Sequence, residues 1–247
     1  MPDFVFNGMR LHYVERGTGP LVVLLPGNTA SSAHMTGDVE HLARGYRVVA
    51  LDLPGTGRSD RMAVWPDDWW GLGAEAAAAL IVHLGEPSAI AIGISGGGVI
   101  ALLMAIRFPA LVRAVVADSC LDRRDPDRWR WVVAGRVSRT PGMIAFWQQG
   151  HGVDWEQVVD ADTDAILRFA DAGGDWFHGQ YARITCPTLL TASMTDTLVP
   201  EVIDRQLAMA RTIPGCCLFH VNGGDHPLMW SRPELFYGAV FAFLATL

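Results

Sequence analysis

The sequence predicts an α/β fold in which a mostly parallel sheet is covered by helices on both faces. Two observations carry this prediction. Short runs rich in Val, Ile and Leu alternate with longer helix-like segments along most of the chain, and continuous apolar runs are typical of parallel strands buried on both faces. Half of the 247 residues are hydrophobic, which suits one well-packed domain with an insertion better than two domains.

The chain opens with the strongest short signal for a β-hairpin. Asn7-Gly8 separates two strand-like runs, at residues 4–6 and 9–14. Both central positions of a type I′ hairpin turn need a positive φ, which Asn and Gly adopt most readily. We therefore expect the first two strands to pair antiparallel.

Six further strands are predicted from short apolar runs. They cover residues 21–25, 46–51, 89–94, 113–117, 188–192 and 217–221. Helix-like segments separate most of these runs, at residues 37–44, 69–84, 99–107, 202–210 and 233–247. Together with the hairpin, the runs predict an eight-stranded sheet.

One interval, residues 121–184, interrupts this alternation. It contains no comparable strand but several helical stretches, and it holds five of the nine tryptophans: Trp129, Trp131, Trp147, Trp155 and Trp176. We expect a small helical cap here, inserted between the core segments 1–120 and 185–247. Hydrophobic packing is the simplest role for its tryptophans, and Trp129 and Trp147 are candidates to line a pocket.

Ser95 lies at the tightest turn that the sequence predicts. An apolar strand precedes it and an apolar helix follows it, so the chain must reverse within about four residues. Such a turn is strained, and Gly93 and Gly97 remove the side chains that would collide there. This Gly-x-Ser-x-Gly pattern is the nucleophile elbow, which lifts the serine hydroxyl above the edge of the sheet.

Two classes of partner are disfavoured. Residues 89–106 form an uncharged run of 18 residues, long enough for a membrane span, but a serine and four glycines stand in its middle and the sequence shows no second span. The net charge is −7, and no basic cluster is longer than Arg123-Arg124, whereas nucleic-acid binding needs Arg and Lys gathered on one face. We expect neither a membrane nor a nucleic acid as partner.

A nucleophilic serine needs a base beside it and a carboxylate that orients the base. Asp196 follows the predicted strand at 188–192, and His226 follows the one at 217–221. Open α/β sheets carry their sites outside the carboxyl ends of their strands. Ser95, Asp196 and His226 are therefore the predicted nucleophile, acid and base, in the chain order Ser, Asp, His.

The chain resembles the α/β-hydrolase family at four places that together span nearly its whole length. These are VVLLPGN at 22–28, which is similar to the strand and oxyanion loop of the family, DLPGTGRSD at 52–60, the acid loop at 187–200 and the histidine loop at 223–233. The resemblance implies that the backbone N–H groups of Asn28 and Gly96 bind the oxyanion. Pro26 stands where the family usually has histidine, so the hydrogen bonds of that side chain to the loop are missing.

The acid of the predicted triad has one competitor. Asp118 follows the strand at 113–117, and Asp122 lies four residues further on; some α/β hydrolases take their carboxylate from this place. Asp196 is preferred because its loop follows the strand directly before the one that leads to His226.

The resemblance implies a serine hydrolase that cleaves a carboxylic ester of a neutral, largely apolar small molecule through an acyl-enzyme, without a cofactor. A lactonase or a carbon–carbon bond hydrolase would use the same triad with another pocket, and a slow-turnover ligand receptor would keep the fold. Pro-Gly-Asn is also similar to the His-Gly-Asn loop of haloalkane dehalogenases. Those enzymes need an aspartate nucleophile followed by tryptophan, and this chain has Ser95 and Gly96 there.

The other chemically active residues predict no further site. The histidines lack metal-ligand spacing, so no metal is expected, while His34, near the oxyanion loop, is a candidate to line the pocket. The four cysteines fit buried free thiols: Cys120, Cys186, Cys216 and Cys217. The N-terminal sequence shows no secretory signal, which predicts a cytoplasmic protein. The oligomeric state is left open.

Overall fold

The computed structural model describes residues 2–247, and these contain one eight-stranded sheet with the strand order β1-β2-β4-β3-β5-β6-β7-β8. The first two strands pair antiparallel, β2 pairs antiparallel with β4, and all other neighbours are parallel. The predicted α/β class is confirmed. The strands are β1 (Asp3–Phe6), β2 (Met9–Arg16), β3 (Leu21–Leu25), β4 (Arg47–Leu51), β5 (Ala89–Ile94), β6 (Val112–Asp118), β7 (Thr188–Ser193) and β8 (Cys217–Val221).

The N-terminal hairpin has the turn that its sequence predicts. Asn7 and Gly8 have φ angles of 49° and 79°, and Phe6 pairs with Met9 across the two-residue loop. A turn with both central residues in the left-handed region matches the right-handed twist of the strands it joins.

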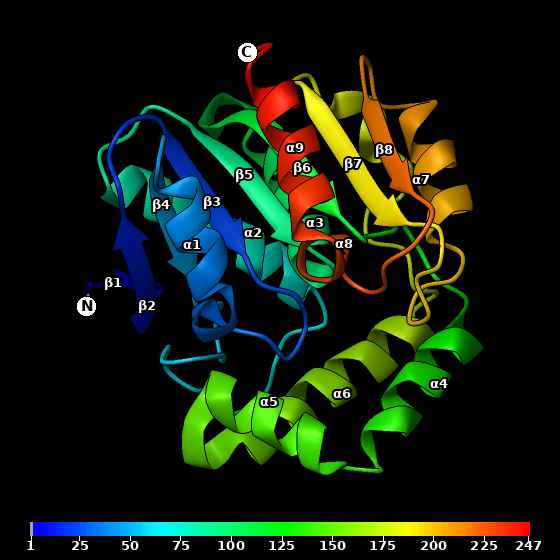
Figure 1. Ribbon diagram of the computed structural model, residues 1–247. Coiled ribbons are helices and arrows are strands. Elements are labelled where there is room, and N and C mark those ends of the chain that lie inside the picture. Colours follow the sequence, from blue (N-terminus) through cyan, green and yellow to red (C-terminus); the bar gives the residue numbers. More distant parts are fainter. Residues whose placement is uncertain (1) are drawn as a thin grey trace.

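Helices cover both faces of the sheet (Figure 1). Alternate residues of β3 contribute to two separate apolar clusters: Val23 and Leu25 belong to one, Val22 and Leu24 to the other. The first cluster includes residues of α2 (Trp69–His83), α3 (Gly96–Arg107) and α7 (Val202–Ala210). The second includes residues of α1 (Thr36–Leu42), α8 (Leu228–Ser231) and α9 (Pro233–Leu244).

The helix after Ser95 begins earlier than its sequence predicts. We expected it from residue 99, whereas α3 begins at Gly96. The first three helical residues are glycines, which have low helix propensity and therefore hide the start of the helix. They are helical because the strained residue Ser95 turns the chain directly from β5 into α3.

Three helices lie between β6 and β7, where the sequence predicts a cap: α4 (Pro126–Arg136), α5 (Pro141–His151) and α6 (Trp155–Asp171). They lie together beyond one end of the sheet (Figure 1). The limits of the cap at 121–184 stay a prediction. Short 3-10 helices complete the described structure: η1 (Ser32–Met35), η2 (Pro109–Leu111), η3 (Gly152–Asp154) and η4 (Gln180–Arg183).

The carboxyl ends of the central strands meet at the edge of the sheet that faces the cap. Gly93 pairs with Leu25, Ile94 with Asp118, and the last residues of β7 and β8 also pair. The uncharged run 89–106 forms β5, the turn and most of α3. No helix between residues 2 and 247 is long and apolar enough to cross a membrane.

Candidate active site

Ser95 occupies a strained turn between β5 and α3. Its φ of 53° and ψ of −120° lie outside the favoured regions for an L-residue. A Cβ at Gly93 would lie 2.0 Å from the carbonyl oxygen of Gly97, and a Cβ at Gly97 would lie 2.1 Å from that of Leu25. Only glycine fits at these two positions, so the local sequence dictates the elbow.

His226 and Asp196 form a hydrogen-bonded pair on the loops that follow β8 and β7. Nδ1 of His226 lies 2.8 Å from Oδ2 of Asp196, and the side chain of Asp196 is fully buried. The other oxygen, Oδ1, accepts hydrogen bonds from the backbone N–H groups of Leu198 (3.0 Å) and Val199 (2.7 Å). The carboxylate therefore has a fixed orientation, and it holds the proton of the imidazole on Nδ1.

Asp225 ties these two loops together. Its Oδ1 accepts from the N–H of Thr197 (2.9 Å), the hydroxyl of Thr197 (2.8 Å) and the N–H of His226 (2.9 Å). The hydrogen bond from the Thr197 backbone is the main reason that the pKa of Asp225 is lowered. The loop carrying the histidine is thus attached to the loop carrying the acid by a charged residue.

Asp118 has a different environment from Asp196. Its Oδ1 accepts from the hydroxyl of Thr191 (2.6 Å) and its Oδ2 from the N–H of Met229 (3.0 Å). Burial raises the pKa of this fully enclosed carboxyl group to about 6. The structure therefore brings Asp196, and not Asp118, to hydrogen-bond distance from His226. Asp122 pairs instead with Arg205 and Tyr181.

The loop after β3 approaches Ser95 closely. A Cβ at Gly27 would lie 3.2 Å from Cβ of Ser95, and a Cβ at Gly96 would lie 2.0 Å from Oδ1 of Asn28. Asn28 and Gly96, the two predicted oxyanion residues, are thus neighbours beside Ser95. Gly96 is also the first residue of α3, where free backbone N–H groups and the helix dipole favour negative charge.

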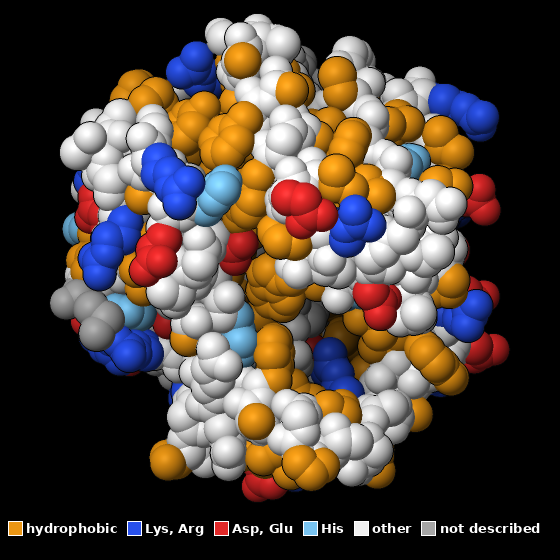
Figure 2. Space-filling view, in the orientation of Figure 1, with side chains coloured by type: hydrophobic (Ala, Val, Ile, Leu, Met, Phe, Trp, Pro, Cys, Tyr) orange, Lys and Arg blue, Asp and Glu red, His pale blue; other side chains and the backbone are white. Residues whose placement is uncertain are grey.

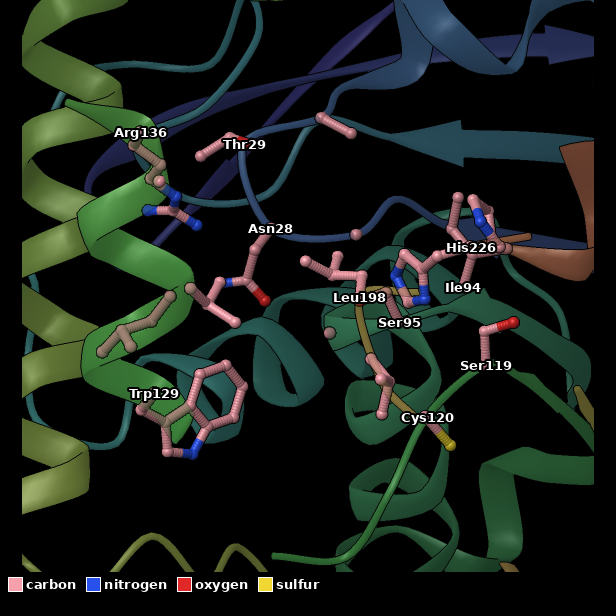
Figure 3. A pocket seen from close by; sticks show the side chains of 18 of the residues that line it. Asn28, Thr29, Ile94, Ser95, Ser119, Cys120, Trp129, Arg136, Leu198 and His226 are labelled. Atoms are coloured by element: carbon pink, nitrogen blue, oxygen red, sulfur yellow. The ribbon is translucent and has the colours of Figure 1, made fainter. Parts of the chain in front are cut away.

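A cavity of about 800 Å³ opens in front of Ser95, between the core and the cap. Figure 2 shows this hollow, with hydrophobic and basic side chains in its walls. Ser95, His226, Asn28 and Trp129 project around it in the close view (Figure 3). Its apolar lining comes from both parts of the molecule: Ile94, Val99, Leu121, Trp129, Trp131, Val132, Met143, Phe146, Trp147, Ile166, Trp176, Leu198, Val199 and Trp230.

We expected His34 to line the pocket, but the described residues that line the cavity do not include it. Its Nδ1 accepts from the N–H of Ser31 (3.1 Å), so its Nε2 donates to the carbonyl oxygen of Phe146 (2.9 Å). Its ring also stacks on that of Phe146 at 3.9 Å. His34 thus joins the core to α5. Burial lowers its pKa, which favours this neutral form.

Two arginines line the cavity. The sequence offered Arg136, with Arg128 and Arg130, as an arginine that could turn inward, but gave no signal for Arg124. Arg124 lies 2.7 Å from Glu201 and faces the ring of Trp129 at 5.0 Å. Arg136 on α4 lies 2.9 Å from Asp162 on α6 and extends toward Asn28 in Figure 3. Each guanidinium is therefore paired with a carboxylate.

Asp162 was missed as well, although the sequence contains a signal for it. It lies on the buried stripe of α6, where apolar residues recur at helical spacing: Trp155, Val158, Val159, Ala165, Ile166 and Phe169. A carboxylate on such a stripe is unusual, because burying a charge is costly unless it is paired. Its partner, Arg136, lies on another helix, so the apolar spacing of α6 does not indicate it.

The site contains groups for nucleophilic chemistry rather than for metal binding. Within residues 2–247, no three His, Cys, Asp or Glu side chains are grouped so as to hold a metal ion. The thiol of Cys120 lines the cavity, but burial raises its pKa, which disfavours the reactive thiolate.

This protein has the features of one class of α/β proteins, those with a site made of a serine, a histidine and a carboxylate. These features are the sheet, the elbow at Ser95 and the hydrogen-bonded pair of His226 and Asp196. The family model described as "Alpha/beta hydrolase family" matches residues 22–239. The chain belongs to this family and is a hydrolase, as its motifs predict. A Ser-Asp-His triad is typical of the family.

Curated relatives are similar over most of this chain. The "Putative carbamate hydrolase RutD" of Pseudomonas syringae pv. syringae is 28% identical over 257 residues, covering 95% of this chain and 97% of the relative. "Polyketide synthase ThaQ" of Burkholderia thailandensis is 27% identical over 267 residues, covering 96% of this chain but 12% of the synthase. The solved "enol-lactonase from Burkholderia xenovorans LB400" has a TM-score of 0.78 and 20% identity, covering 99% of this chain and all of the other. At that identity, the likeness concerns the fold.

Proposed function

We propose that this protein hydrolyses carboxylic esters of neutral, largely apolar small molecules through an acyl-enzyme on Ser95. The observation that carries the proposal is the 2.8 Å contact between His226 Nδ1 and Asp196 Oδ2, in a histidine that shares its cavity with Ser95. An imidazole whose Nδ1 is bound to a carboxylate presents Nε2 as the basic nitrogen.

Acylation begins when the hydroxyl oxygen of Ser95 attacks the ester carbonyl carbon and its proton moves to Nε2 of His226. The imidazolium that forms is stabilised by the carboxylate of Asp196. The developing oxyanion accepts hydrogen bonds from the backbone N–H groups of Asn28 and Gly96. Donors that are already in place cost no reorganisation at that moment.

Collapse of the tetrahedral intermediate expels the alcohol, which takes the proton from His226. Water then enters the same position, and His226 removes a proton from it as it attacks the acyl-enzyme. The acid leaves, and Ser95 regains its proton. The cycle consumes one water, and its other catalytic groups are side chains and backbone N–H groups of this chain.

The lining of the cavity supports a neutral substrate. Within the described lining, the only Arg, Lys, Asp or Glu side chains are Arg124 and Arg136, and each already has a carboxylate partner. An ionised substrate would lose its hydration against mostly apolar walls without gaining an unpaired counter-charge.

Substitution of the nucleophile tests this proposal. Ser95→Ala should lower kcat for nitrophenyl esters by roughly three to six orders of magnitude, because only binding and oxyanion stabilisation remain. A fluorescent organophosphonate should label Ser95 and leave Ser119, the other serine that lines the cavity beside it, unmodified. A folded Ser95→Ala variant with near-normal turnover would remove Ser95 from the mechanism.

The same triad also fits lactones, carbamates and substrates cleaved at a carbon–carbon bond, since each offers an electrophilic carbonyl. The RutD relative is named for carbamates, so carbamates belong in the substrate panel beside esters and lactones of matched chain length. The highest Ser95-dependent kcat/KM identifies the substrate class. Ligand binding without measurable Ser95-dependent turnover on this panel would favour the alternative that the protein is a ligand receptor. The cytoplasmic location stays a prediction.

A further inference from the structure

Asp162 is a fully buried carboxylate that the proposed chemistry does not use directly. It lies on α6 in the cap, and its side chain is 0% exposed. We infer that Asp162 is a positioning residue, which holds the side chain of Asn28 and thereby the oxyanion loop in its working orientation. This inference rests on the proposed function of the site.

The contacts of Asp162 join the cap to this loop. Its Oδ1 accepts a short hydrogen bond from Nδ2 of Asn28 (2.5 Å), and its Oδ2 accepts from Arg136 (2.9 Å). Arg136 is fixed in turn by the hydroxyl of Thr163 (2.9 Å). On the other side of the amide, Oδ1 of Asn28 accepts from the indole of Trp70 on α2 (3.3 Å). Both ends of the Asn28 amide therefore have assigned partners, one from the cap and one from the core.

The orientation of this amide affects the neighbouring oxyanion donor. Oδ1 of Asn28 lies close to Gly96, where a Cβ would come within 2.0 Å of it. If the bond to Asp162 is lost, the side chain of Asn28 is free to move, and its oxygen, which already lies beside Gly96, can approach the N–H of that residue. That oxygen would then compete with the substrate oxyanion for the donor. Asp162 prevents this by holding the amide in the position where its oxygen accepts from Trp70.

Other cap residues hold the same loop, whose Pro26 lacks the side-chain hydrogen bonds of the usual family histidine. Nε2 of His151 donates to the carbonyl oxygen of Thr29 (3.0 Å), while its Nδ1 accepts from the N–H of Gly57 (3.0 Å). The carbonyl oxygen of Gly150 accepts from the hydroxyl of Ser31 (2.9 Å). Thr29 has a φ of 57°, a conformation that persists only where its surroundings enforce it. The cap therefore supplies support that the loop does not provide for itself.

The test compares Asp162→Asn with Asp160→Asn as a matched control. Asp160 lies on the same helix, but it is exposed and pairs with Arg139, away from the loop. We expect Asp162→Asn to lower kcat for nitrophenyl esters by about 10- to 100-fold with KM within about twofold, since the loss falls on the transition state. The rate constant for labelling of Ser95 by an organophosphonate should fall in parallel, and the control should keep both values.

The labelling rate separates this inference from the proposed function. It depends on Ser95 and the oxyanion donors, but not on ester turnover. Slow labelling of Asp162→Asn together with an absence of ester, lactone and carbamate hydrolysis in the unmodified protein would overturn the proposed function and leave the positioning role intact. Unchanged labelling and unchanged kcat would overturn the positioning role.

Two further variants address a purely structural effect. Asp162→Asn alone leaves the charge of Arg136 unpaired, which could prevent folding. The double variant Asp162→Asn with Arg136→Gln removes both charges and permits the same measurement in that case. An asparagine at position 162 has one acceptor oxygen for two donors, Asn28 and Arg136, whereas Asn28→Ala removes the hydrogen bond completely. Adding Asp162→Asn to Asn28→Ala should cost little more than the larger single effect. A merely structural role would lower the titrated fraction of reactive Ser95 and leave kcat per reactive site unchanged. That result, or strictly additive losses, would contradict the coupling.

Discussion

Asp118 and Asp196 lie on neighbouring strands or their loops, but they have different partners. Asp196 is bonded to two backbone N–H groups and to His226. Asp118 is bonded to Thr191 and Met229, and its role is to anchor the start of α8. The nature of the partner, rather than burial, distinguishes the two, because both side chains are enclosed.

Asparagine substitution at each position should separate their roles in the proposed mechanism. Asp196→Asn places an amide against Nδ1 of His226, which favours the wrong tautomer, and should cost about 10⁴-fold in kcat. Asp118→Asn should cost much less, because its amide can donate to the Thr191 hydroxyl and still accept from the N–H of Met229. Parallel steady-state kinetics decide between them. A severe loss in Asp118→Asn beside a mild one in Asp196→Asn would transfer the role of the acid.

Asp118 should also affect stability as a function of pH. Its pKa of about 6 in the fold lies above the ordinary value of 3.8, so the folded chain binds this proton more tightly than the unfolded chain. The stabilisation of the fold by protonated Asp118 is therefore fully present below about pH 4 and is lost as pH rises to about 6. The two pKa values differ by an amount equivalent to about 3 kcal/mol.

Urea unfolding at pH 4, 5, 6 and 7 measures this effect. The free energy of unfolding of Asp118→Asn relative to the unmodified protein should rise across this range and then level off. A difference that is constant from pH 4 to pH 7 would show that Asp118 titrates normally in the fold.

At the scale of elements, the turn from β5 to α3 depends on the absence of a side chain at Gly97. The atoms that a Cβ would meet there are the backbone carbonyl oxygens of Leu25 and Pro26, at 2.1 and 2.6 Å, and they belong to the strand and loop beside the site. We expect Gly97→Ala to destabilise the fold by at least about 3 kcal/mol, at the upper end for overpacking.

Gly238→Ala is the matched control for this prediction. Gly238 lies in α9, where an added Cβ meets no atom within 4 Å, so alanine should stabilise by about 0.5 to 1 kcal/mol through helix propensity. Denaturant unfolding of both variants gives the comparison. A Gly97→Ala protein as stable as the unmodified one would mean that β3 and α3 do not cross this closely.

At the scale of the whole molecule, the core carries the proposed reacting groups and the cap supplies most of the aromatic wall of the cavity. Trp147 in that wall stacks on Trp155 at 5.3 Å, which fixes its ring against the cap. Selectivity is therefore expected to follow from how the two parts enclose the acyl group.

A matched substrate pair measures this selectivity. The nitrophenyl half-ester of a dicarboxylic acid should have a kcat/KM at least about tenfold below that of its methyl-terminated analogue, since a carboxylate entering the cavity loses hydration that the paired arginines do not replace. The opposite preference would show that Arg124 or Arg136 exchanges its carboxylate partner for the substrate.

The sequence by itself determined the features that depend on neighbouring residues. Apolar runs predicted the strands, the Asn7-Gly8 pair predicted the hairpin turn, and Gly93 and Gly97 predicted the elbow around Ser95, because helix, strand and turn are encoded within about ten residues. Two observations were sufficient to nominate the site: the chain order Ser95, Asp196, His226, and the position of each residue just after the carboxyl end of a strand. Parallel strands bring these ends to one edge of the sheet.

Only the tertiary structure decided which distant groups meet. The bond between Asn28 and Asp162 joins residues 134 positions apart, and the placement of His34 outside the cavity and of Arg136 within it depends on how the cap rests on the core. These contacts follow from the packing of one layer against another, which has no periodic trace in the sequence. Local pattern therefore nominated the residues of the proposed site, and the docking of the cap specified which residues support that site and which line its cavity.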